Sequence, residues 1–117
     1  MKYHGEQRWK EEKPYHTDEY STRLYGDAAL AALEAHEPKA PLFLYLPWQA
    51  VHEPLEAPER YVRPYATPRS PVYIGDASRR VYAGMVAALD EGLSNISHTL
   101  FIHGLWNSTI LVHSTDK

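Results

Sequence analysis

The sequence predicts an α/β fold, and three segments of the 117-residue chain lead to this prediction. Residues 42–46 are an apolar run of strand-forming residues that passes directly into a polar, proline-containing loop, which predicts a buried strand, as does the second run described below. Residues 76–103 carry apolar side chains at intervals of three and four, which is the period of an amphipathic helix. Residues 109–113 are a second short run, rich in β-branched side chains. A strand, a helix and a strand in this order predict a right-handed β–α–β unit in a parallel sheet.

The composition is that of a globular chain. Apolar residues make up 44% of the sequence and aromatic residues 12%, and the formal net charge is −3 with both signs interspersed. This charge pattern lacks the basic stripe that nucleic-acid binding requires, and no apolar segment approaches the roughly 20 residues of a membrane-spanning helix. The first residues contain no apolar stretch of the signal-peptide type. We therefore expect one domain over residues 1–117, with residues 1–20 as a surface loop and residues 21–116 as a strand–helix core.

A first helix is predicted over residues 27–36, where alanine and leucine dominate. Asp27 and Thr22 are candidate N-caps, and Pro38 is expected to stop the helix. Apolar side chains on most sides of this segment predict that it packs against a sheet.

The long helix over residues 76–103 has a continuous apolar stripe. The stripe consists of Val81, Met85, Leu89, Leu93, Ile96 and Leu100. Asp76 and Ser78 are candidate N-caps, and Gly104 is a typical stop signal. Between the first strand and this helix, residues 59–65 are expected to form a short helical turn that Pro64 ends.

Two polar side chains follow the two predicted strands. His52 comes after the first strand and Asp116 directly after the second. Because the carboxyl ends of parallel strands meet at one edge of a sheet, we expect both side chains on the same rim. Aspartate is a hard oxygen ligand for Ca²⁺ or Mg²⁺, and histidine supplies a proton or a hydrogen bond to an anion. Either residue alone is more often structural, but the pair defines a candidate site.

Two sequons bear on the cellular location, whereas the absence of cysteine bears only on the chemistry of these residues. Asn95 and Asn107 each begin an N-x-[ST] tripeptide, which predicts N-glycosylation and a secretory-pathway protein. The 117 residues contain no cysteine, which excludes a disulfide, a thiol nucleophile and a thiolate metal site within them.

Three longer stretches carry a family resemblance. They read PLFLYLPWQAVHEPLEAPERYVRPY, RRVYAGMVAALDEGLSNISHTL and HGLWNSTILVHSTD. In order and spacing they resemble the type I sulfatases, most closely the arylsulfatase B group (N-acetylgalactosamine-4-sulfatase) with arylsulfatases I and J. The resemblance covers about residues 15–116. It implies that the chain is an internal fragment of an alkaline phosphatase-like α/β sandwich, a partial sulfatase catalytic domain.

The resemblance also implies an activity. Sulfatases hydrolyse sulfate esters, here on sulfated glycans or aryl sulfates, with a formylglycine nucleophile and a calcium ion. By resemblance, His52 contacts the substrate sulfate or assists the leaving group, and Asp116 is a calcium ligand. The family normally has an asparagine next, where this chain has Lys117; either the second metal ligand is lost or the last residue is not genuine. The C-x-P-x-R motif that yields formylglycine is absent from these residues, so we expect the chain alone to be inactive.

Two alternatives remain open at this point. The chain could belong to a truncated, non-catalytic pseudo-sulfatase, or to another alkaline phosphatase-like hydrolase that cleaves phosphoesters. The resemblance and the sequons together predict a lysosomal or secreted protein, and the charge pattern and short apolar runs predict no nucleic-acid partner and no membrane span.

Overall fold

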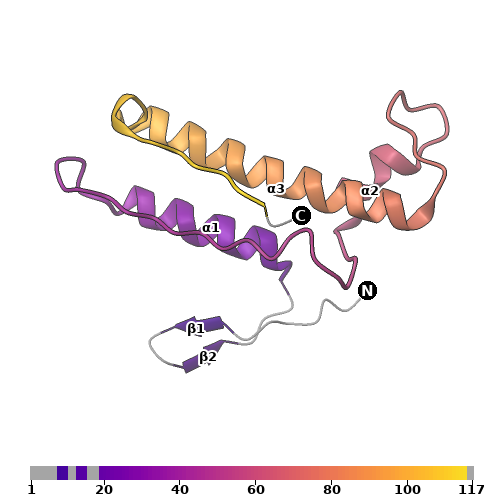
Figure 1. Cartoon of the computed structure of the whole chain (residues 1–117), viewed down its shortest axis with the longest axis horizontal. Coiled ribbons are helices and arrows are strands. Elements are labelled where there is room, and N and C mark those ends of the chain that lie inside the picture. Colours follow the sequence, from indigo (N-terminus) through magenta and orange to yellow (C-terminus); the bar gives the residue numbers. More distant parts are fainter. Residues whose placement is uncertain (1–7, 11–12, 16–18, 116–117) are drawn as a thin grey trace.

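The computed structural model describes residues 8–10, 13–15 and 19–115. Its elements, in chain order, are β1 (Arg8–Lys10), β2 (Lys13–Tyr15), α1 (Ser21–Glu34), α2 (Glu59–Ala66), α3 (Ala77–Ile102) and the 3-10 turn η1 (Trp106–Ser108). Helices α1 and α3 run side by side, and α2 packs near the start of α3 (Figure 1). Strands β1 and β2 pair antiparallel, so part of the expected N-terminal loop is a short hairpin.

The two segments expected to be parallel strands are extended but form no β-ladder. Residues 42–46 run along α1, and residues 109–113 run back along α3 (Figure 1). Their backbone–backbone hydrogen bonds, among the described residues, are confined to a turn at Leu46 and a turn at Thr109. A strand needs a hydrogen-bonded neighbour, and neither segment has one within the part of the chain that the structure describes. The predicted parallel β–α–β unit is therefore not formed in the described part of the chain.

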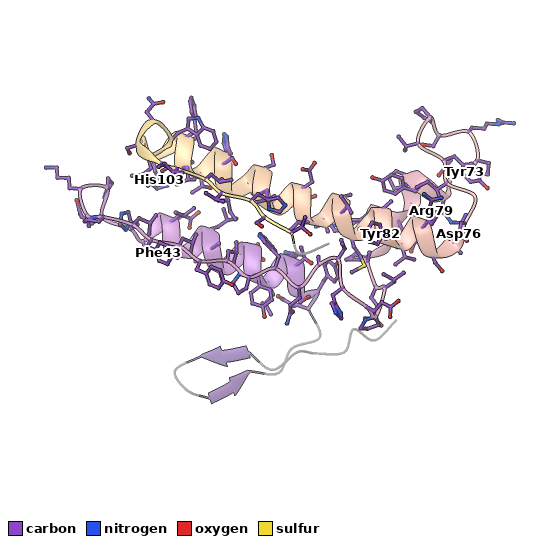
Figure 2. All side chains as sticks on the ribbon, viewed as in Figure 1. Phe43, Tyr73, Asp76, Arg79, Tyr82 and His103 are labelled. Carbon is purple, nitrogen blue, oxygen red and sulfur yellow. The ribbon has the colours of Figure 1, made fainter. Side chains whose placement is uncertain are left out.

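Side-chain exposure alternates along both extended segments. Phe43 and Tyr45 are 91% and 76% exposed, whereas Leu44 between them is 39% exposed. Ile110 and Val112 are likewise 90% and 83% exposed. A period of two is that of a β-strand with two different faces. The expectation that these runs are buried is wrong here, because their outer face has no layer packed on it; Phe43 on this face is labelled in Figure 2.

This exposed apolar face predicts the behaviour of the isolated chain. We expect the 117-residue chain alone to self-associate or to remain partly unfolded, because unpaired strand edges and exposed apolar side chains promote aggregation. Replacing Phe43 and Ile110 together by lysine should increase the soluble monomer fraction, measured by size-exclusion chromatography with light scattering. A sharp, reversible melt of a monomeric wild-type chain would contradict this prediction.

Helix α3 begins and ends where the sequence predicts. The Asp76 carboxylate accepts a hydrogen bond at 2.8 Å from the backbone N–H three residues later, so Asp76 is the N-cap. At the other end Gly104 has a φ of 71°, in the left-handed region that glycine tolerates. The Gly104 N–H donates to Phe101 O at 3.0 Å, and the Leu105 N–H donates to Leu100 O at 2.9 Å. These two bonds are the pair of a Schellman motif, which ends the helix.

Helix α1 starts six residues earlier than the predicted segment 27–36. No side chain caps its first turn, so neither Asp27 nor Thr22 acts as an N-cap. Asp27 instead pairs with Arg23 at 3.4 Å, one turn back on the exposed surface. Thr22 and Gly26 are buried, which shows that tertiary packing extends the helix beyond its alanine-rich part.

Helix α2 also extends beyond its predicted end. Pro64 lies inside the helix, which continues to Ala66. A proline inside a helix removes one backbone hydrogen bond and disfavours a long continuation, and here the helix continues for only two residues after Pro64.

The core lies between α1 and α3. Its buried side chains are Ala29, Leu33, Ile96 and Leu100. Within the predicted α3 stripe, Met85 is buried as well, and the other members are half-buried. Helix α1 therefore packs on a helix in the described residues, and the predicted packing on a sheet is not formed there. No helix among the described residues is long and apolar enough to span a membrane.

Candidate functional site

An open groove of about 1940 Å³ runs along the α1–α3 pair and is bordered by both extended segments. His52 lines it, in the loop that follows the first segment. Ser114 and Thr115 line it from the C-terminal segment. The structure thus brings His52 and the stretch that leads to Asp116 to the same groove.

The structure places His52 in the groove but does not describe Asp116, so it does not give the distance between the two side chains. Asp116 and Lys117 lie outside the described residues. Thr115, directly before Asp116, is the last described residue and borders the groove. The placement of both side chains on one rim stays a prediction.

The imidazole of His52 is exposed, and one of its nitrogens is held by the backbone. Nδ1 lies 2.7 Å from the carbonyl oxygen of Glu53. A carbonyl only accepts, so Nδ1 carries the proton in this hydrogen bond. Nε2 is then the nitrogen available to a ligand, as an acceptor in the neutral ring and as a donor in the imidazolium. An imidazolium Nε2–H is suited to an anionic ester oxygen.

A polar cluster between α2 and α3 was not predicted from the sequence. The Tyr61 hydroxyl donates to Glu91 Oε1 at 2.9 Å, and Arg60 Nη2 lies 3.1 Å from the same oxygen. The Arg60 guanidinium also lies 4.4 Å from the centre of the Tyr61 ring. Burial first, and then the hydrogen bond to Glu91, raise the pKa of Tyr61 above its ordinary 10.0. Because 30 residues separate Tyr61 from Glu91, no local pattern pairs them.

The raised pKa of Tyr61 gives a stability prediction. Above pH 10 the unfolded chain releases this proton before the folded one does, so the folded state binds more protons and loses stability as pH rises. We expect Tyr61→Phe to show a weaker loss of stability than wild type between about pH 9 and about pH 11. Urea unfolding of the whole gene product that contains this chain measures the difference. Tyr73→Phe, at an exposed tyrosine, is the control, and equal slopes for all three proteins would refute the assignment.

The described side chains do not form a metal-binding group. Between residues 19 and 115, no group of three or more histidine, aspartate or glutamate side chains is placed to hold a metal ion. Asp116, the expected calcium ligand, is outside this range. The described residues therefore do not form a calcium site by themselves.

Both sequon asparagines are exposed. Asn95 lies in α3 and Asn107 in η1. Asn95 also borders a small polar cavity of about 250 Å³ between α1, α2 and α3. Exposure is necessary for N-glycosylation, and the modification itself stays a prediction at both positions.

His52, which borders the groove, lies within the QAVHEPL motif that contributes to the sulfatase resemblance. The chain matches the sulfatase family over residues 2–117, and it belongs to that family. Sulfatases have an alkaline phosphatase-like α/β fold. The chain is 41% identical to mouse arylsulfatase J over 98 residues, which are 84% of this chain and 15% of that protein. The predicted family is thus confirmed, and the chain spans about 15% of the length of this relative.

Proposed function

We propose that this chain is part of a sulfuric ester hydrolase of the arylsulfatase type, which acts on sulfated glycans or aryl sulfates. The observation that carries the proposal is His52, which lies in the groove within the family's V-H-x-P-L motif. The family match over residues 2–117 supports it.

His52 has a defined task in this proposal. The carbonyl of Glu53 holds Nδ1 and thereby orients the ring. Nε2–H then donates a hydrogen bond to a sulfate oxygen, or a proton to the departing ester oxygen. Asp116 would supply one carboxylate oxygen to a calcium ion. The positive charge of this ion would balance the negative charge of the sulfate ester. The nucleophile would be a formylglycine from outside these residues, since the chain has no cysteine.

The two extended segments have a related role. We infer that residues 42–46 and 109–113 become strands of the sulfatase sheet in the whole gene product. Their alternating exposure and their unpaired backbone groups support this, because both are properties of a strand before its neighbour is added.

A direct assay tests the proposed activity. The whole gene product is incubated separately with 4-nitrophenyl sulfate and 4-nitrophenyl phosphate. We expect faster release of nitrophenol from the sulfate. Faster cleavage of the phosphate would overturn the proposal in favour of a phosphoester hydrolase.

A non-catalytic pseudo-sulfatase is the second candidate, and Lys117 is the observation that favours it. Its ammonium group cannot coordinate a cation and would repel one, at a position where the family resemblance implies an asparagine ligand. In the same assay this candidate predicts cleavage of neither ester. Gain of sulfatase activity on Lys117→Asn would then identify the lost ligand as the cause.

The cellular location is proposed from the sequons. A lysosomal or secreted protein would carry glycans on Asn95 and Asn107. Peptide N-glycosidase should reduce the apparent mass of the protein from secretory cells, and Asn107→Gln should remove part of this change.

A further inference from the structure

Trp48 lies in a notch between α1 and α3 that two glycines create. A Cβ added to Gly92 would lie 2.8 Å from the indole Cη2, and one added to Gly26 would lie 3.5 Å from the same atom. The tip of the indole therefore rests on glycine backbone from both helices. The ring also packs against the core cluster defined above. Any larger residue at position 92 would require the indole to shift, because a 2.8 Å carbon–carbon contact is not tolerated.

The same tryptophan directly precedes the turn that ends at His52. The His52 N–H donates to Gln49 O at 3.0 Å, which closes residues 49–52 into a tight turn. The Trp48 N–H donates to Leu46 O at 3.1 Å, so the chain also turns just before the indole. The indole, which packs against the core cluster, is thus connected to the exposed imidazole of His52 through a single turn of the chain.

We propose that Trp48, seated in the Gly26–Gly92 notch, is a positioning residue that sets the place of His52 in the groove. The inference rests on the proposed role of His52 in contacting the sulfate ester. A displacement of a catalytic group by about 1 Å costs up to about 100-fold in rate. Trp48 acts only through the position of His52.

The test uses Gly92→Ala in the whole gene product. We expect kcat/KM toward 4-nitrophenyl sulfate to fall by about 10- to 100-fold, measured on the folded fraction well below its melting temperature. Gly84→Ala is the matched control on the same helix: its new methyl would lie 2.9 Å from Val62 Cγ2, 3.3 Å from Ala57 Cβ and 3.3 Å from the backbone carbonyl carbon of Tyr61, and none of these nearest atoms belongs to Trp48. We expect this control to lower the melting temperature comparably but to change kcat/KM less than about twofold.

A double substitution separates positioning from general destabilisation. Phenylalanine lacks the atom that Gly92→Ala would contact, so Trp48→Phe relieves the clash. We expect Gly92→Ala with Trp48→Phe to be no less active than Trp48→Phe alone, since the effects of contacting residues are not additive. Equal activity losses in Gly92→Ala and Gly84→Ala, or purely additive effects of the pair, would overturn the inference.

A second readout does not depend on turnover. The ring resonances of ¹³C-labelled His52, assigned with His52→Gln, should shift in Gly92→Ala and stay in place in Gly84→Ala. If the wild-type protein does not cleave 4-nitrophenyl sulfate, the proposed function is refuted, and with it the predicted effect of Gly92→Ala on kcat/KM. A normal wild-type activity with unshifted His52 resonances in Gly92→Ala would refute the positioning alone.

Discussion

His52→Ala in the whole gene product is expected to lower kcat/KM for aryl sulfate hydrolysis by about 10²- to 10⁴-fold, the usual contribution of a general acid. The reason is the geometry at the ring: Nδ1 is engaged by Glu53, and Nε2 remains for the substrate. The substitution removes that donor from the groove without removing a buried side chain, because His52 is exposed. Steady-state kinetics with 4-nitrophenyl sulfate measure the loss.

The control for this experiment is His98→Ala. His98 is an exposed histidine on α3 and should affect activity less than about twofold, as surface substitutions away from a site usually do. A series of aryl sulfates with leaving groups of rising pKa distinguishes the two roles of His52. If it protonates the leaving group, the loss in His52→Ala grows along the series; if it binds the sulfate, the loss stays constant. An alanine variant that keeps more than about a third of wild-type activity would exclude both roles.

Leu33→Ala is expected to lower the free energy of unfolding by about 2–5 kcal/mol. Leu33 is 1% exposed and belongs to the buried cluster that joins α1 to α3. Truncation removes three side-chain carbons from this cluster and leaves a cavity between two helices that the neighbouring backbone cannot fill. Urea unfolding of the whole gene product, followed by circular dichroism, gives the value.

The matched control is Glu34→Ala, one residue further along α1. Glu34 is exposed, so its replacement should change the free energy of unfolding by less than about 0.5 kcal/mol. Equal effects at both positions would mean that the α1–α3 contact does not contribute to the stability of the protein.

The sequence by itself determined helix α3 to within one residue at each end. Its apolar period, the N-cap Asp76 and the stop at Gly104 are local features, and the hydrogen bonds of the structure confirm both caps. The sequence also determined the family, because the motifs around His52 are specific enough to identify it without knowledge of the fold. The family match over residues 2–117 agrees. Both features could be predicted because they depend on residues that are close together in the sequence.

Only the tertiary structure decided the rest. Whether residues 42–46 form a strand depends on a neighbouring strand, which is a non-local partner, and the described residues provide none. The early start of α1 depends on burial of Thr22 and Gly26 against other elements, which outweighs weak helix propensity. The seat of Trp48 between Gly26 and Gly92 joins residues far apart in the chain, and close packing of that kind leaves no periodic signal in the sequence.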